Sequence, residues 1–119
     1  MGRYRLTKSA KADIGSILRM SEERYGRDAR TRYSALLLVA MRRIAADAEG
    51  RSTSDQCDVR PGIRSYHIRH SRHESRDRSR EAPVADPVHV IFYRAVEPGL
   101  VEIVRVLHER MQPSRHIGR

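Results

Sequence analysis

Large aromatic side chains and long apolar runs are scarce in this 119-residue sequence. It has no tryptophan, and Phe92 is its one phenylalanine. No apolar run approaches the roughly 18 residues that a membrane span requires. Residues 1–6 also lack the apolar stretch of a signal peptide. We therefore expect a cytoplasmic protein with one domain, residues 1–119, whose small core is filled by aliphatic residues and the five tyrosines.

Cysteine is nearly absent, which excludes an internal disulfide. Cys57 is the one cysteine, and nothing near it supplies the spacing of metal ligands. His67, His70, His73 and Glu74 lie close together in the sequence. However, side chains three apart in a strand point to opposite faces of the sheet. We expect no metal site and no cofactor.

Lysine is rare although the chain is strongly basic. The net charge is +9, and Lys8 and Lys11 are the two lysines, so arginine supplies the excess. The planar arginine fork matches phosphates and carboxylates alike. The charge therefore indicates a polyanionic partner, which is nucleic acid, the ribosome or an acidic protein segment. A surface charge that only confers solubility is the alternative.

The first part of the sequence predicts a short strand and two helices. Residues 3–6 predict the strand, and the hydroxyl of Thr7 can accept a hydrogen bond from a free amide of the next turn. Apolar residues then recur at steps of three and four in two stretches, separated by Gly26, which suits the left-handed position that closes a helix. The two stripes are Ala10, Ile14, Ile17, Leu18, Ser21 and Tyr25, and Tyr33, Leu36, Leu37, Ala40 and Ile44. The second helix begins at Asp28 and fades by residues 49–50, so the two form a helical hairpin facing one core.

The second half of the sequence predicts three strands in a meander. We expect these strands at residues 63–70, 88–95 and 100–107. Pro61-Gly62 predicts the turn into the first of them, and Glu97-Pro98-Gly99 the turn into the last. The last strand is almost entirely apolar on both faces. It should therefore lie inside the sheet rather than at its edge.

The remaining segments predict loops and a tail. Residues 51–58 are polar and aperiodic, and residues 71–87 predict a long flexible hairpin loop with almost nothing apolar to bury. Residues 108–119 form a basic tail, with one helical turn after Pro113. The fold class is therefore α+β, with a short amino-terminal strand, a helical hairpin and a three-stranded antiparallel meander. Both helices should cover one face of the sheet and leave the other face open to a partner.

Several segments resemble the ParE toxins of the RelE/ParE superfamily, in the order of that family. Residues 60–65 (RPGIRS) resemble the entry to the second strand, residues 89–94 (HVIFYR) the third strand, and residues 103–111 (IVRVLHERM) the last strand and the start of the tail. The opening YRLT with Ala10 and Asp13 also matches, as does Tyr25-Gly26. The resemblance covers nearly the whole chain except residues 71–86, where the family usually turns within a few residues.

This resemblance implies the toxin of a type II toxin–antitoxin system. It implies a ParD-like antitoxin that wraps an otherwise flexible carboxy-terminal segment around the toxin. For the best-known members it also implies DNA gyrase as the target, so the protein would be an inhibitor rather than an enzyme. We expect target contacts from basic tail residues, namely His108, Arg110, Arg115 and His116.

Three arginines on separate predicted strands are candidate antitoxin contacts. Arg64, Arg94 and Arg105 could converge on one patch that receives acidic side chains of the antitoxin. Alternatively, they are rim residues whose stems cover apolar neighbours.

The related RelE branch, which cleaves messenger RNA on the ribosome, is the alternative function. That reaction needs groups that activate a ribose 2′-hydroxyl, stabilise a pentacovalent phosphate and protonate the leaving oxygen. The candidates would be Arg64, Arg94, Arg105, His108, Arg110 and His116. RelE-type sites tend to use several lysines and a tail tyrosine, whereas both lysines here lie in the first helix and the last tyrosine is Tyr93. We therefore assign no catalytic residue. A non-toxic basic nucleic-acid-binding module is a further alternative.

Overall fold

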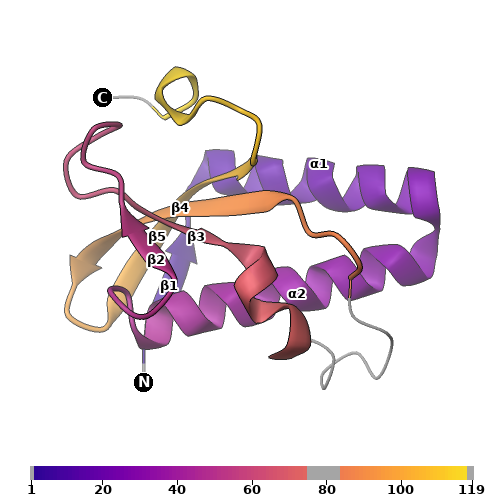
Figure 1. Cartoon of the computed structure of the whole chain (residues 1–119), viewed down its shortest axis with the longest axis horizontal. Coiled ribbons are helices and arrows are strands. Elements are labelled where there is room, and N and C mark those ends of the chain that lie inside the picture. Colours follow the sequence, from indigo (N-terminus) through magenta and orange to yellow (C-terminus); the bar gives the residue numbers. More distant parts are fainter. Residues whose placement is uncertain (1, 75–83, 118–119) are drawn as a thin grey trace.

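The computed structural model describes residues 2–74 and 84–117, in which a mixed sheet packs against a helical hairpin (Figure 1). The elements are β1 (Arg3–Leu6), α1 (Lys8–Tyr25), α2 (Arg27–Ala46), β2 (Thr53–Asp55), β3 (Arg64–His67), the 3₁₀ turn η1 (Ile68–Ser71), β4 (His89–Glu97), β5 (Leu100–His108) and the 3₁₀ turn η2 (Pro113–Arg115). The strands lie in the order β1-β5-β4-β3-β2. β1 runs parallel to β5, and the other neighbours are antiparallel. The predicted α+β fold and meander are confirmed.

The residues predicted to begin and end the first helix do so. Thr7 Oγ1 accepts a hydrogen bond from the Ala10 amide at 3.0 Å and donates one to the Val104 carbonyl at 2.8 Å. The hydroxyl therefore caps α1 and also fixes its start against β5. Gly26 takes a φ of +95° between the helices, a conformation that favours glycine.

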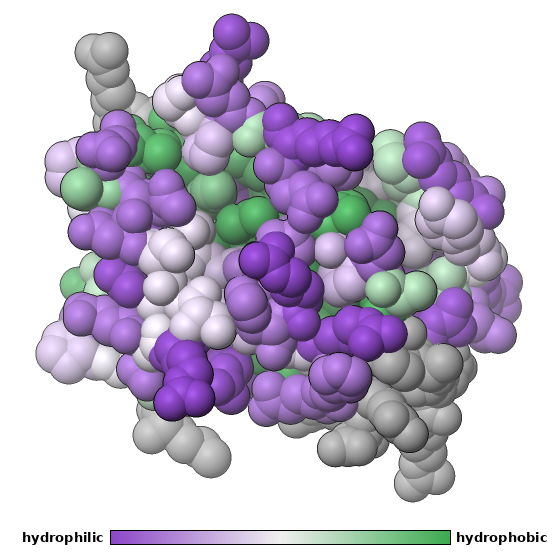
Figure 2. Space-filling model, in the orientation of Figure 1, coloured by the Kyte–Doolittle hydropathy of each residue, from purple (hydrophilic) through white to green (hydrophobic). Residues whose placement is uncertain are grey.

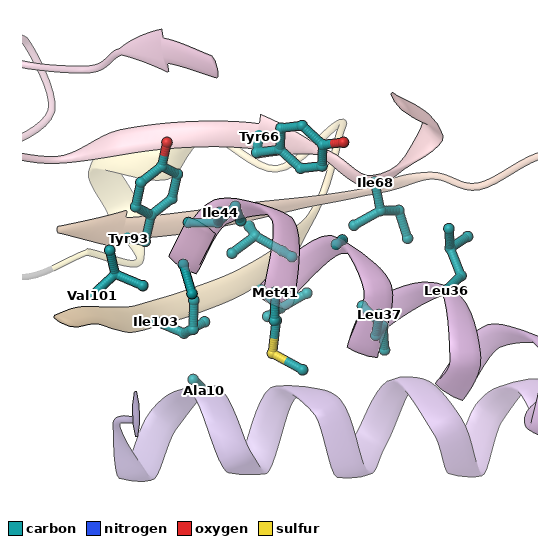
Figure 3. Close-up of a cluster of buried hydrophobic side chains, with 14 of the residues drawn as sticks. Ala10, Leu36, Leu37, Met41, Ile44, Tyr66, Ile68, Tyr93, Val101 and Ile103 are labelled. Carbon is teal, nitrogen blue, oxygen red and sulfur yellow. The ribbon is translucent and has the colours of Figure 1, made fainter. Parts of the chain in front are cut away.

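The helix face of the sheet carries the main core. α2 lies between the sheet and α1, as Figure 3 shows, and its predicted stripe is buried. The largest side chains with at most 1% exposure in this cluster are Leu36, Leu37, Ile44, Tyr66, Ile68, Ile91, Tyr93 and Ile103. Burial of these side chains provides most of the hydrophobic stabilisation, because each removes a large apolar area from water.

α1 is less buried than its stripe predicts. Ala10 is its one fully buried residue, and Ile14, Ile17 and Leu18 are half-buried. Tyr25 is 74% exposed, so its predicted place in the core is wrong. The reason is its position at the tip of the hairpin, which extends beyond the sheet (Figure 1).

Two predicted boundaries in the second half are wrong. Residues 51–58 are not entirely a loop, because Thr53–Asp55 forms β2 and pairs with β3. The strand expected at residues 63–70 ends at His67. There the His67 ring accepts a hydrogen bond from the Arg69 amide at 3.1 Å, which helps to close the 3₁₀ turn η1. β4 and β5 begin and end within about two residues of the predicted positions.

β5 lies inside the sheet, as its apolar sequence predicts, but the sheet face opposite the helices is not fully open. A second small core of Ile63, Phe92 and Val104 lies on that face, and Ile117 of the tail packs against it. Ile117 is 4% exposed. The expectation of a free face is therefore wrong where the tail covers it.

The two ends of the predicted long loop have contacts with the body of the protein. Ser71 is fully buried and its hydroxyl lies 2.8 Å from that of Tyr66. Val84 packs against the main core, and its carbonyl accepts a hydrogen bond from Arg72 Nε at 2.5 Å. The rest of the predicted loop, residues 75–83, lies outside the described residues.

The surface is mostly polar on the face seen in Figure 2, where hydrophobic residues form small areas between hydrophilic ones. In the described ranges, no helix is both long and apolar enough to cross a membrane.

Candidate functional site

Arg105 faces α1 and the tail. Its Nε and Nη2 atoms donate to the two carboxylate oxygens of Asp13 at 2.7 and 2.8 Å, and its Nη1 donates to the His116 carbonyl at 2.9 Å. The side chains of Arg105 and Asp13 are 24% and 14% exposed. The hydrogen bonds from Asp13 raise the pKa of Arg105 above its ordinary value. Arg105 therefore joins a helix, a strand and the tail.

Asp13 also completes the edge of β5. β1 pairs with β5 only from Leu100 to Ile103, so a strand neighbour is missing further along. The first turns of α1 take its place, because Asp13 Oδ2 accepts a hydrogen bond from the Val106 amide at 2.9 Å. Together with Thr7, this carboxylate satisfies backbone groups that would otherwise form an open strand edge.

Arg94 lies on the sheet face opposite the helices. Its Nε donates to Glu102 at 2.9 Å, and Arg5 of β1 donates to the other oxygen of that carboxylate at 3.0 Å. Burial raises the pKa of Glu102, but the hydrogen bonds from Arg94 and Arg5 outweigh it, so the pKa lies below its ordinary value. The Arg94 side chain is 37% exposed, which leaves part of its guanidinium accessible to a partner.

Arg64 of β3 lies on the helix face of the sheet, next to β2. It is paired across the β3–β4 ladder with Tyr93, whose side chain belongs to the main core. Its Nη2 donates to Thr53 Oγ1 at 2.7 Å, whereas its Nε is buried without a hydrogen-bond partner in the structure. The Tyr93 hydroxyl donates to the Ala48 carbonyl at 2.5 Å, and burial raises the Tyr93 pKa.

Arg64 lies on the other face of the sheet from Arg94 and Arg105, so the three strand arginines do not form one patch. Arg94 follows Tyr93 in β4 and points to the opposite face, because side chains alternate along a strand. Arg105 pairs with Phe92, which lies on the face away from the helices, so Arg105 shares that face with Arg94 but turns toward Asp13 and the tail. Contact of each arginine with an antitoxin stays a prediction, and the greater exposure of Arg94 favours it over Arg105.

His108 ends β5 next to His89, which sequence reasoning did not single out. The two rings are paired across β4 and β5 with centroids 5.7 Å apart. His89 Nδ1 lies 2.6 Å from the Tyr33 hydroxyl, which itself accepts a hydrogen bond from the Val88 amide at 3.3 Å. Burial raises the pKa of Tyr33 to about 12, so its hydroxyl keeps the proton.

Stability should fall in mild acid because of His89. Burial, with His108 and His67 nearby, lowers the pKa of His89 from 6.5 to about 4. Between about pH 6.5 and 4, His89 is protonated in the unfolded chain but not in the folded chain. The free energy of unfolding therefore decreases as the pH falls through this range. Allowing for partial exposure, we expect a contribution of about 1–2 kcal/mol. Urea unfolding of His89→Gln from pH 7 to 4.5 should show a shallower loss than the unchanged chain; an identical loss would contradict the assignment.

The histidines at this end of the sheet are arranged as hydrogen-bonding groups. His67 Nε2 lies 2.7 Å from Glu109 Oε1, and His108 Nδ1 accepts a hydrogen bond from the Arg110 amide at 3.1 Å. Because Nδ1 accepts from a backbone amide in His67 and His108, the neutral form of either ring carries its proton on Nε2. In residues 2–74 and 84–117, no group of three or more His, Cys, Asp or Glu side chains could hold a metal ion. Independence from metals and cofactors stays a prediction.

The tail presents most of the predicted target contacts. Arg110, Arg115 and His116 are exposed, and His108 is half-buried at the end of β5. η2 begins at Pro113, as the sequence predicts, and its hydrogen bonds from the amides of His116 and Ile117 both end on the Pro113 carbonyl. Target binding by these four residues stays a prediction.

Comparison with known proteins identifies the family. The profile described as "ParE toxin of type II toxin-antitoxin system, parDE" matches residues 4–113. The chain belongs to the ParE toxin family. "Toxin ParE1" of Caulobacter vibrioides is 33% identical over 116 residues, and the match covers 97% of each chain. "Toxin ParE1" of two Mycobacterium tuberculosis strains is 31% identical over 117 residues with the same coverage.

As a ParE-family protein, the chain is the toxin component of a type II toxin–antitoxin system and has an antitoxin partner. Asp13 is part of the resemblance to this family, but the sequence did not indicate which residues it contacts. One signal was available, because Asp13 is the one acidic residue in positions 1–21 of a basic chain. His89 and Tyr33 gave no comparable signal, since their proximity depends on how α2 packs on β4.

Proposed function

We propose that this ParE-family toxin inhibits DNA gyrase in the cytoplasm and that a ParD-like antitoxin neutralises it. The family match over residues 4–113 carries the proposal, because it spans both helices, the sheet and the start of the tail. The family is that of the toxins of parDE systems, which supports an antitoxin of the ParD kind.

Inhibition by binding fits the distribution of exposed groups. Arg110 and Arg115 are exposed on the tail and offer planar donors to carboxylates or DNA phosphates of a gyrase complex. An inhibitor needs such contact groups and needs no group that reacts. The net charge of +9 also speeds approach to an acidic partner at low salt.

Antitoxin binding fits the helical hairpin and the sheet face that carries Arg94. A shallow groove on the hairpin is lined by Arg27, Ser34 and Leu38, with the Glu22–Arg30 ion pair at 3.2 Å beside it. This surface is mixed, with Ala35 and Leu38 among charged and hydroxyl side chains, and it suits an amphipathic segment with acidic residues. Arg94 would receive a carboxylate from the same antitoxin.

Ribosome-dependent RNA cleavage is the second candidate, and the adjacent rings of His89 and His108 are the observation that favours it. Two features oppose it. Both lysines lie at the start of α1, and Tyr93, the last tyrosine, is fully buried with its hydroxyl on the Ala48 carbonyl. Tyr93 therefore has no access to a substrate.

Expression of the chain alone should arrest bacterial growth, and co-expression of the adjacent antitoxin should restore it. Plasmid DNA from arrested cells should be relaxed while messenger RNA stays intact, because gyrase rather than the ribosome is inhibited. Topoisomer gels and RNA blots from the same cultures would test this. Normal growth at verified protein levels would contradict the toxin function, and codon-dependent cuts that vanish in His108→Ala would favour RNA cleavage instead.

A further inference from the structure

The Asp13 carboxylate is held by donors from two consecutive residues of β5. It accepts a two-pronged interaction from Arg105 and a further hydrogen bond from the Val106 amide, and its side chain is 14% exposed. Charge-assisted pairs with two parallel bonds are among the strongest and most directional in proteins. Asp13 thus fixes the orientation of the Arg105 guanidinium.

The third guanidinium nitrogen of Arg105 contacts the tail. Its Nη1 donates to the His116 carbonyl at 2.9 Å, and the next residue, Ile117, is buried against Phe92 and Val104. The hydrogen bonds of η2 itself stay within residues 112–117. Arg105 therefore supplies a polar attachment from the body of the protein at the point where the tail settles on the sheet.

We infer that Asp13, acting through Arg105, is a positioning residue that holds the tail and thereby supports toxicity. The inference rests on the proposed function in one respect, namely that the tail contacts the target. Arg115 and His116 are exposed beside the attachment point, so a fixed backbone presents them in one arrangement. If loss of the attachment leaves that arrangement populated about one tenth of the time, apparent affinity for the target falls about tenfold.

An ion pair that only stabilises the fold would leave the tail in place when it is broken. Glu102→Gln is the matched control for such a pair. Glu102 also lies on β5 and also receives hydrogen bonds from two arginines, Arg5 and Arg94, but neither arginine bonds to the described part of the tail, which ends at Ile117. Asp13→Asn keeps the size of the side chain and removes its charge. Both variants should lose some stability, whereas only Asp13→Asn should release the tail.

Two measurements on the full chain test the inference. The first is hydrogen exchange of the Ile117 amide, which is bonded to the Pro113 carbonyl. We expect exchange to speed up about tenfold or more in Asp13→Asn and less than about twofold in Glu102→Gln. The second is the protein level needed to arrest growth, which should rise about tenfold in Asp13→Asn with little change in Glu102→Gln.

Arg105→Lys keeps the positive charge but loses the fork, and it should behave like Asp13→Asn. It serves as the second variant if Asp13→Asn fails to fold. Unchanged Ile117 exchange in the variant that folds would overturn the inference, as would equal loss of toxicity in Glu102→Gln. Growth arrest does not presuppose the target. If the unchanged chain arrests growth but leaves gyrase active, the proposed target is wrong. The inference about Asp13 is then still tested by the Ile117 exchange and the toxicity of the variants.

Discussion

Phe92→Ala is expected to lower the free energy of unfolding by about 3–5 kcal/mol. Phe92 is 4% exposed and lies at the centre of the small core on the sheet face opposite the helices. Ile63 and Val104 beside it belong to strands or the turn before β3, so they cannot easily move in to fill the space. The expected loss therefore combines lost hydrophobic burial with a residual cavity. Urea unfolding followed by circular dichroism would measure it.

Ile117→Ala provides the comparison within the same cluster. Its side chain is equally buried, but it lies at the end of the tail, where the chain can rearrange at little cost. We expect a loss of about 2 kcal/mol or less. If Phe92→Ala costs no more than Ile117→Ala, the cluster is not the second core that its burial indicates.

Arg94→Ala is expected to weaken antitoxin binding by about 2 kcal/mol or more, which is roughly thirtyfold in Kd. Arg94 is partly exposed and lies on the face away from the helices, where an antitoxin segment can reach it. A carboxylate of the antitoxin that becomes buried against this guanidinium would be left without its partner. Titration calorimetry at two salt concentrations would measure the loss.

Arg42→Ala is the control, because Arg42 is exposed on α2 and represents a rim charge. It should cost about 1 kcal/mol or less. Arg64→Ala and Arg105→Ala should be titrated in parallel, after correction for their own losses of stability. Equal weakening by Arg94→Ala and Arg42→Ala would show that the charge serves the target rather than the antitoxin.

The parts of the fold that depend on local pattern could be predicted from the sequence. Thr7, Gly26 and the stripe of α2 mark the hairpin because capping and helical periodicity act within one or two turns. β2 could not be predicted, since Thr53–Asp55 is polar and becomes a strand only through pairing with β3. The path of the tail could not be predicted for the same reason, because Ile117 is buried only through contact with Phe92 and Val104 of distant strands.

The candidate site was harder to predict than the fold. The sequence places Arg64, Arg94 and Arg105 on separate strands, but the face that each occupies depends on register. Arg64 pairs with Tyr93 on the helix face, whereas Arg94 and Arg105 pair with Glu102 and Phe92 on the other face. Asp13 was visible as the lone acidic residue of its region, yet nothing local connects it to a strand more than 90 residues away.

A supercoiling assay with purified gyrase and the purified toxin would show directly whether this protein inhibits gyrase. The toxin should inhibit conversion of relaxed plasmid to supercoiled plasmid, and the antitoxin added beforehand should prevent the inhibition. Programmed ribosomes incubated with the same preparation should keep their messenger RNA intact. Full gyrase activity at excess toxin, together with cleavage of the ribosome-bound message, would contradict the account.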